Sequence, residues 1–314
     1  MKPIRDKIVV QACANIALIK YWGKRDENLF LPTKNSISIS MPNLVTTTCV
    51  QENSTDQIIL DNKILSEKES KKIVNFLDKF REIYKIKQKF KIITQNNFPT
   101  AAGLASSSSG FAAIALGLNK YYDLNLSKKE LSILARQGSG SACRSIYNGF
   151  VIWFKGQKKD GSDSSAQQLF DEFYWPEFKI LSVIVNDQEK LVSSRIAMQQ
   201  TVNTSSYYKE WLIESENRIP KVMDAIKNKD FNRVGQLAQD DCLGMHKAIR
   251  LSNPKIDFWQ EGTREIIKIV ENLNKSSIDC YFTIDAGPNV KILCLDENYE
   301  EIKKVILDSK FSVL

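Results

Sequence analysis

The first part of the chain is built from short apolar segments separated by polar stretches. These segments are mostly rich in β-branched side chains, which favour extended strands. The strands predicted in this way are Ile8 to Ala14, Ser36 to Met41, Thr46 to Gln51, Gln57 to Leu60 and Lys89 to Thr94. Asp61 and Asn62 supply turn-forming side chains after the fourth of them. The pattern therefore indicates a sheet that forms early in the chain.

Two helices of this half begin with a capping signal, in which a serine is followed three residues later by a glutamate. Ser127 with Glu130 predicts one of them. Ser66 with Glu69 predicts the other, and its apolar residues recur at helical spacing. The expected buried face consists of Ile73, Phe76, Leu77, Phe80 and Ile83.

The second half changes in character, from strands to longer helices. Segment 155–168 is polar and predicts an exposed excursion between strands at Phe150 to Phe154 and Lys179 to Val185. The later elements predicted are helices Tyr207 to Lys227 with a kink at Pro220, Phe231 to Ile249 and Phe258 to Leu273, strands Cys280 to Ile284 and Val290 to Leu295, and a helix from Tyr299. Strands followed by helices are typical of the α+β class. We expect two domains, 1–187 and 188–314.

Composition narrows the class of protein. The chain has 314 residues, of which 43% are hydrophobic and 26% charged, so it can bury a core without disulfide or metal support. Its formal charge of +7 suits an anionic ligand, but no basic block carries interleaved aromatic residues, which disfavours nucleic-acid binding. The apolar run from Ile8 to Ile19 is interrupted by Gln11 and Asn15, which excludes it as a membrane span.

The cysteines indicate a reducing compartment. Six are present, spaced too widely for a metal site and partly embedded in apolar runs, so reduced buried thiols are favoured over disulfides. We therefore expect a cytoplasmic protein that binds neither membrane nor nucleic acid.

A loop of small residues, Asn97 to Leu104, runs into a predicted helix from Ala105 to Tyr122. Small side chains allow close approach of the backbone to a phosphate, and the free amides at a helix start attract anions. Ser106 to Ser109 could add hydroxyl groups. Phosphate binding is favoured here over the alternative, a tightly packed helix surface. The Walker pattern is absent.

Three other segments carry candidate chemistry. The segment from Gly138 to Arg144 combines hydroxyl groups with a guanidinium, a combination that suits a carboxylate or diphosphate. Asp285-Ala-Gly-Pro-Asn289 is, from its residues alone, equally a turn or a site. Lys20 closes an apolar run and needs either an anionic partner or a route to water. His246 is the only histidine, and its place on a predicted helix favours a packing role over catalysis.

Together these segments resemble the diphosphomevalonate decarboxylase family, a branch of the GHMP small-molecule kinase superfamily. The motifs occur in the family's order and cover nearly the whole chain. They are Asn15-Ile-Ala-Leu-Ile-Lys-Tyr-Trp-Gly-Lys24, Leu31-Pro with Asn35 to Ser38, Phe98 to Ser107, Ala135 to Ala142 with Arg144 to Tyr147, Val192 to Arg195 and Asp285 to Asn289. Segment 247–254 departs from the family's pattern, which is usually richer in Thr and Pro.

The resemblance implies a GHMP kinase fold, with an N-terminal half like ribosomal protein S5 domain 2 and a ferredoxin-like C-terminal half. It implies that Asp285, Lys20 and Arg144 are catalytic, with Arg144 holding the substrate carboxylate. The substrate-binding residues it implies are Tyr21, Lys24, Ser139, Gly140, Ser141, Ser194 and Arg195. The ATP-binding residues it implies are Asn97, Pro99, Ala102, Gly103, Leu104, Ala105, Ser106 and Ser107, with Ser106 or Ser107 also serving the Mg²⁺ that ATP carries.

The implied reaction is the ATP-dependent decarboxylation of mevalonate 5-diphosphate to isopentenyl diphosphate, with ADP, phosphate and CO₂ as further products. The hydroxyl on carbon 3 would be phosphorylated first. Two alternatives within the superfamily are a decarboxylase of mevalonate 5-phosphate and a plain kinase of mevalonate or its phosphate. A basic RNA-binding module is a more distant alternative. A homodimer is compatible with the resemblance.

Overall fold

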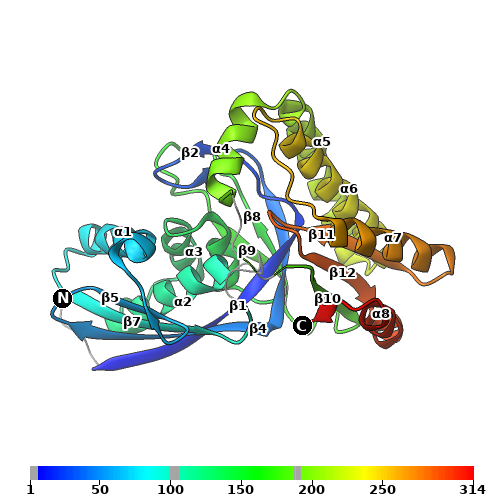
Figure 1. The fold of residues 1–314 in the computed structure, drawn as a ribbon. Coiled ribbons are helices and arrows are strands. Elements are labelled where there is room, and N and C mark those ends of the chain that lie inside the picture. Colours follow the sequence, from blue (N-terminus) through cyan, green and yellow to red (C-terminus); the bar gives the residue numbers. More distant parts are fainter. Residues whose placement is uncertain (1–5, 100–105, 187, 189–191) are drawn as a thin grey trace.

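The computed structural model describes residues 6–99, 106–186, 188 and 192–314. These described residues form a seven-stranded, a four-stranded and a two-stranded sheet. Figure 1 shows the elements of the first part of the chain on one side and those of the last part on the other. The helices are α1 (Glu67–Tyr84), α2 (Ser106–Tyr121), α3 (Lys128–Arg136), the 3₁₀ helix η1 (Gly140–Ile146), α4 (Ser194–Thr204), α5 (Tyr208–Lys227), α6 (Phe231–Arg250), α7 (Glu261–Lys275) and α8 (Asp296–Asp308). This mixture confirms the predicted α+β class.

The larger sheet has the strand order β6-β5-β7-β4-β8-β9, and β1 also pairs with β4. Most of its pairs are antiparallel, whereas β5 and β7 are parallel. Its strands are β1 (Lys7–Ile19), β4 (Ser36–Asn53), β5 (Gln57–Leu60), β6 (Lys63–Ile64), β7 (Lys89–Asn96), β8 (Phe150–Trp153) and β9 (Ala166–Phe170). A separate hairpin joins β2 (Lys24–Asp26) and β3 (Leu31–Pro32).

Strand β4 corrects one sequence prediction. The segments from Ser36 to Met41 and from Thr46 to Gln51 belong to one long strand. Its pairing with β1 passes from Ala14 opposite Met41 directly to Cys13 opposite Val45, so 42–44 form an irregularity inside the strand. A bulge keeps the strand continuous where the pattern of side chains is broken.

Helices α1 and α2 pack on this sheet and form its core together with α3. Both predicted capping boxes are confirmed, at Ser66 with Glu69 and at Ser127 with Glu130. The predicted apolar face of α1 is wrong at Ile83, which is 49% exposed. Ile83 lies in the last turn of α1, and helical spacing alone does not reveal where the helix loses contact with the sheet.

Segment 155–168 is also only partly as predicted. Residues 157–160 are exposed, but Ser164 and Ala166 are buried. Strand β9 begins at Ala166 and pairs with β8. The Trp153 indole N–H donates to Ser164 Oγ at 3.2 Å. Ser164 can be buried because Trp153 of β8 supplies a hydrogen-bond partner, and the polar composition of the segment did not indicate this partner.

The second sheet has the order β11-β12-β10-β13. Its strands are β10 (Phe178–Ile184), β11 (Cys280–Ile284), β12 (Val290–Leu295) and β13 (Ser312–Val313). Helices α7 and α8 start at Glu261 and Asp296 rather than at Phe258 and Tyr299. Phe258 precedes α7 and packs in a cluster with Trp22. Pro220 lies inside α5, which continues on both sides of it.

The predicted division at residue 187 stays a prediction. One observation bears on it: β10 precedes this position but pairs with β12 and β13, which follow it. In the part of the chain that the structure describes, no helix is both long and apolar enough to cross a membrane.

Candidate active site

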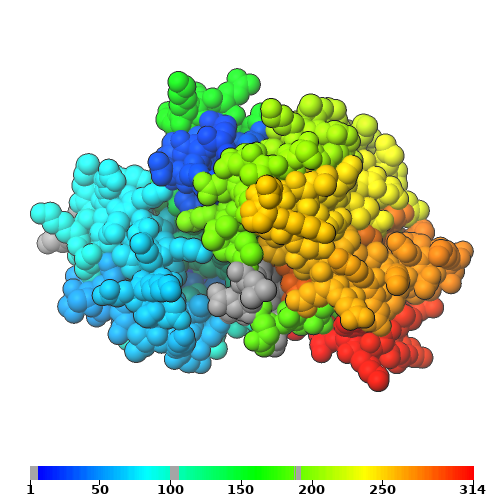
Figure 2. Space-filling view, turned by 45° about the horizontal axis from the view of Figure 1, so that its top comes forward, coloured from blue at the N-terminus to red at the C-terminus, as the bar shows by residue number. Residues whose placement is uncertain are grey.

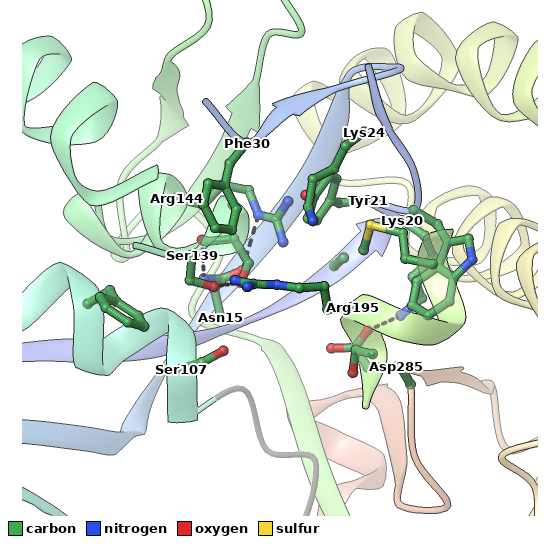
Figure 3. A pocket seen from close by; sticks show the side chains of 18 of the residues that line it. Asn15, Lys20, Tyr21, Lys24, Phe30, Ser107, Ser139, Arg144, Arg195 and Asp285 are labelled. Carbon is green, nitrogen blue, oxygen red and sulfur yellow. Dashed lines mark hydrogen bonds and ion pairs between the residues drawn. The ribbon is translucent and has the colours of Figure 1, made fainter. Parts of the chain in front are cut away.

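A cavity of about 310 Å³ lies between the two parts of the molecule. Its wall combines residues beyond the end of β1, the first residues of α2, η1, the start of α4 and the turn after β11. In Figure 2 the two parts of the chain face each other, with the α4 segment lying where they meet. Figure 3 shows the polar side chains that converge on the cavity.

The cavity contains an ion pair between Lys20 and Asp285. Lys20 Nζ lies 2.7 Å from Asp285 Oδ1, and the side chain of Lys20 is 1% exposed while that of Asp285 is 30% exposed. Lys20 therefore has the anionic partner that was one of its two predicted outcomes. Asp285 follows β11 directly, and Figure 3 shows its carboxylate turned toward the cavity.

The electrostatic surroundings keep Asp285 ionised. Burial raises the pKa of its carboxyl group, but the charges of Lys20, Lys291 and Arg144 and the hydrogen bond from Lys20 together bring that pKa below its usual value. Asp285 is thus ionised near neutral pH and can act as a proton acceptor, although a weak one. The segment is not merely a turn between strands, because its carboxylate lines the cavity.

Arg144 lies on η1 and is 3% exposed. Its Nε donates to Asn15 Oδ1 at 3.1 Å and its Nη1 donates to Ser36 Oγ at 2.7 Å. Asn15 in turn donates to Ser145 Oγ at 2.8 Å. These bonds fix the guanidinium plane, and Arg144 lines the cavity as a cation with further N–H groups to offer.

The segment from Ser139 to Ser141 lies against Tyr21. Both serine hydroxyls line the cavity, 3.5 Å from each other. A Cβ atom on Gly140 would lie 2.7 Å from the Tyr21 hydroxyl, so glycine permits this approach. Tyr21 Oη and Trp22 Nε1 are buried without a hydrogen-bond partner among the described residues. Burial raises the pKa of Tyr21, so its hydroxyl remains a donor that a ligand could satisfy.

Several cations gather around Phe30 at the same cavity. The charged groups of Lys24, Lys79 and Arg195 lie 5.0, 5.4 and 5.1 Å from the centre of its ring. The aromatic face partly offsets the repulsion between them. Lys24 also pairs with Glu27, and burial lowers the pKa of Lys24. Ser194 and Lys72 also line the cavity. This region can hold a highly charged anion.

The start of α2 brings Ser106 and Ser107 to the cavity. Serine hydroxyls at a helix N-terminus are compatible with nucleotide phosphates and with the Mg²⁺ bound to them. Ala102, Gly103, Leu104 and Ala105 lie outside the described residues. Asn97 and Pro99 do not line the cavity, and the Asn97 side chain bonds to the backbone of Asn43 and Val45.

His246 lies outside the cavity wall, in agreement with its predicted packing role. It is 1% exposed, and its Nε2 lies 3.2 Å from the Ile284 carbonyl oxygen, to which it can donate only when it carries the proton. Burial lowers the pKa of His246 to about 3. The residue is therefore neutral at ordinary pH.

Sequence reasoning did not select several residues that build the site. Asn15 and Ser36 orient Arg144. Asn15 is a polar residue inside the apolar part of β1, which is a signal that a buried partner exists, whereas Ser36 begins β4 and carries no such signal. Lys72, Met198 and Met245 also line the cavity. They lie on helices in which nothing local distinguishes a cavity-facing residue from its neighbours.

Two family models match consecutive parts of the chain. The model described as the diphosphomevalonate decarboxylase-like N-terminal domain matches residues 12–166. The model described as the mevalonate 5-diphosphate decarboxylase C-terminal domain matches residues 180–312. Together they span most of the 314 residues.

Curated relatives agree with these matches. Diphosphomevalonate decarboxylase of Candida albicans is 36% identical over 313 residues, covering 95% of this chain and 86% of the relative. That of Saccharomyces cerevisiae is 37% identical, covering 93% of this chain and 79% of the relative.

Solved structures are similar along nearly the whole chain. Mevalonate diphosphate decarboxylase from Staphylococcus aureus has a TM-score of 0.93 at 38% identity, covering 98% of this chain and 94% of that one. The enzyme from Enterococcus faecalis has a TM-score of 0.91 at 40% identity, covering 98% and 95%. A structure described as "MDDEF in complex with MVAPP, AMPPCP and Magnesium" has a TM-score of 0.92 at 41% identity, again covering 98% and 95%.

Proposed function

The chain belongs to the diphosphomevalonate decarboxylase family, and we propose that the cavity around Lys20, Arg144 and Asp285 carries out the family's reaction. The protein is an ATP-dependent decarboxylase of mevalonate 5-diphosphate with the GHMP kinase fold, and it uses ATP and Mg²⁺. The observation that carries the assignment of residues is the ion pair of Lys20 and Asp285 in the same cavity as the guanidinium of Arg144.

The reaction needs ATP because of the leaving group. Loss of CO₂ from a 3-hydroxy acid leaves an electron pair, which can form the new double bond only if the oxygen on carbon 3 departs. Hydroxide departs poorly, whereas phosphate departs readily. Phosphorylation of the hydroxyl therefore precedes loss of CO₂, and isopentenyl diphosphate, ADP and phosphate are the other products.

We assign Asp285 to the hydroxyl group on carbon 3. Its lowered pKa keeps the carboxylate ionised, so it accepts a hydrogen bond from this hydroxyl and orients the oxygen toward the phosphorus atom. A carboxylate of low pKa is too weak a base to deprotonate an alcohol early. In a loose phosphoryl transfer the oxygen gains acidity only as the bond to phosphorus forms, so a weak base in the right place suffices.

Lys20 and Arg144 neutralise charge on either side of this hydroxyl. Lys20 holds Asp285 in place and offers positive charge to the developing phosphate. Arg144 is oriented by Asn15 and Ser36, and we assign its remaining N–H groups to the substrate carboxylate. This carboxylate is the group that leaves as CO₂, and a kinase acting on the hydroxyl alone would not require the contact.

We assign the diphosphate of the substrate to the part of the cavity where serine hydroxyls and the cations around Phe30 lie. Ser194 and Arg195 are proposed to approach the diphosphate. The full set of proposed substrate-binding residues is Tyr21, Lys24, Ser139, Gly140, Ser141, Ser194 and Arg195. The convergence of Lys24 and Arg195 on the Phe30 ring supports this assignment, because such closely spaced cations favour a polyanion.

The nucleotide is assigned to the start of α2. The proposed residues are Ser106 and Ser107 for phosphate and Mg²⁺, with Asn97, Pro99 and 102–105 in the preceding loop. Within the described residues no group of three or more His, Cys, Asp or Glu is placed to hold a metal ion, which fits a cation that arrives with the nucleotide. When bound, Mg²⁺ would neutralise phosphate oxygens during the transfer.

We also propose a cytoplasmic location, two domains dividing near residue 187 and a homodimeric state. All six cysteines are free, which supports a reducing compartment. Light scattering tests the assembly, since a monomer has a mass of 35.8 kDa and a dimer twice that mass.

The test of the function is an assay of purified protein with Mg²⁺, ATP and either mevalonate 5-diphosphate or mevalonate 5-phosphate. We expect one ADP and one phosphate for each CO₂ with the diphosphate. Phosphorylation without CO₂ release would instead indicate a kinase, and faster turnover of the monophosphate would contradict the assigned substrate. CO₂ release at full rate without ATP would contradict the mechanism.

A further inference from the structure

Helix α6 contacts the chain on both sides of the Lys20–Asp285 ion pair, through side chains that do not line the cavity. Asp241 is fully buried, and its Oδ2 accepts the backbone N–H of Lys20 at 2.7 Å. Its Oδ1 accepts the Ser215 hydroxyl. Lys20 is the first residue beyond β1, after the ladder with β4 has ended at Ile19. Asp241 therefore takes the place of a strand partner at this position.

The carbonyl of Lys20 is held as well. Lys34 Nζ donates to it at 2.9 Å, and Lys34 is 1% exposed. The charge of Asp241 favours the protonated form of Lys34, although burial lowers the pKa of Lys34 to about 8. The backbone N–H and the backbone carbonyl of Lys20 are thus both hydrogen-bonded to buried ionisable side chains. This arrangement fixes the direction in which the lysine leaves the main chain.

The same helix holds the residue before Asp285. The backbone N–H of Ile284 donates to Cys242 Sγ at 3.2 Å. The carbonyl of Ile284 lies 3.2 Å from His246 Nε2 and 3.5 Å from Cys242 Sγ. His246 must carry its proton on Nε2 to donate here, and its low pKa leaves it neutral over the working range. Asp285 therefore extends from a backbone fixed by α6.

We propose that Asp241 and His246 are positioning residues, through which α6 sets the distance and angle between the Lys20 ammonium and the Asp285 carboxylate. Asp241 acts through the backbone of Lys20 and His246 acts through the backbone of Ile284. The inference rests on the proposed function, because it concerns a pair whose catalytic role is assigned above.

The geometry explains why one helix can do this. Positions 241, 242, 245 and 246 lie on one face of α6, since residues separated by four are neighbours on a helix. Met245 on this face reaches the cavity wall. Lys20 and Asp285 follow strands of two different sheets, so pairing within either sheet does not fix their separation. A displacement of about 1 Å at a reacting group can cost about 100-fold in rate.

The experiment compares paired variants in which the hydrogen bond is removed or retained. His246→Leu removes the donor at similar volume, whereas His246→Gln places an amide N–H near the position of Nε2. Asp241→Ala removes the acceptor, whereas Asp241→Asn retains an oxygen for the Lys20 N–H. Gln239→Leu is the matched control, because Gln239 Oε1 on the same helix accepts the N–H of Phe282 at 3.1 Å, farther from Asp285.

We expect kcat to fall about 10- to 100-fold in His246→Leu and Asp241→Ala, with KM for mevalonate 5-diphosphate and for ATP within about threefold of wild type. His246→Gln and Asp241→Asn should recover most of kcat, and Gln239→Leu should retain it. Each rate is divided by the fraction of the protein that binds ATP, so that partial unfolding of a variant is not mistaken for a lower kcat. If Asp241→Ala does not fold, the His246 pair decides the question.

The possible results separate this inference from the proposed function. A wild-type protein that releases no CO₂ would overturn the proposed function and the inference with it. An active wild type with unchanged kcat in His246→Leu would overturn the inference alone. Failure of His246→Gln to recover turnover would also overturn it, because the hydrogen bond would then not be the cause.

Discussion

Replacing Asp285 with Asn removes one negative charge and changes the side-chain volume very little. In the wild-type structure Lys20 Nζ lies 2.7 Å from Asp285 Oδ1, and the side-chain oxygen of Asn could accept a hydrogen bond from Lys20 in the same way. The side chain of Asp285 is 30% exposed. Lys20 keeps a hydrogen-bond acceptor but loses its anionic partner, so the cost to stability should be about 1 to 3 kcal/mol. The fold and the affinity for ATP should survive.

The cost to the reaction should be much larger. Loss of a positioned proton acceptor typically lowers rates about 10²- to 10⁴-fold, or about 3 to 5 kcal/mol in the barrier. Lys20 is almost fully buried and would be left facing a neutral amide, so its charge would no longer be balanced at the hydroxyl. Because phosphorylation comes first, release of both ADP and CO₂ should nearly stop.

The assay is a single turnover with enzyme in excess, in which ADP and CO₂ are followed separately and ATP binding is measured beside them. Asp279→Asn makes the same change at the opposite end of β11, where Asp279 accepts a hydrogen bond from Asn232 at an exposed position, and should behave as wild type. Normal phosphate transfer with failure only at CO₂ release would show that Asp285 acts after the transfer. Normal rates for both steps would refute a catalytic role.

Other changes test different parts of the site. Arg144→Gln leaves the substrate carboxylate unpaired, so kcat/KM for mevalonate 5-diphosphate should fall by a factor that corresponds to about 2 to 5 kcal/mol of lost transition-state stabilisation. Wild-type kinetics in a variant with a normal circular dichroism spectrum would rule this out. Gly140→Ala places a Cβ 2.7 to 2.8 Å from Tyr21, whose ring lies 4.7 Å from that of Trp153 and has little room to retreat. The KM for the diphosphate substrate should rise about 10-fold while that for ATP holds, at a stability cost of about 1 to 3 kcal/mol; equal effects on both KM values would argue against a Tyr21 contact with the substrate. Burial in the folded protein lowers the pKa of His246 from its ordinary value of 6.5 to about 3. Between these two pH values the unfolded chain binds a proton at His246 and the folded protein does not. The contribution of neutral His246 is complete above pH 6.5, and the free energy of unfolding should fall below that pH by up to about 1.4 kcal/mol per unit. Urea unfolding at pH 7 and pH 5 checks this, and His246→Gln should show a flatter dependence; an identical dependence in both proteins would contradict the assigned pKa.

Local chemistry was enough to predict many elements. The capping boxes at Ser66 and Ser127 were correct because a serine and a glutamate three residues apart satisfy the helix start without help from elsewhere. The strand at Cys280 to Ile284 was correct because its mainly apolar residues are buried, apart from the partly buried Tyr281. The motifs also placed Lys20, Arg144 and Asp285 among the candidate residues, and the structure brings all three to one cavity.

The amino-acid sequence by itself determined which chemical groups the protein has and which local conformations they favour. The tertiary structure decided which of those groups meet. Lys20 and Asp285 are separated by 265 positions, and Asp241 reaches the backbone of Lys20 across 221. Such contacts depend on strand register and on the packing of α6 against two sheets, whereas periodicity and capping act over only a few residues. For the same reason Asn15, whose amide looked like an interruption of an apolar strand, is revealed as the partner of Arg144 only when the chain is folded.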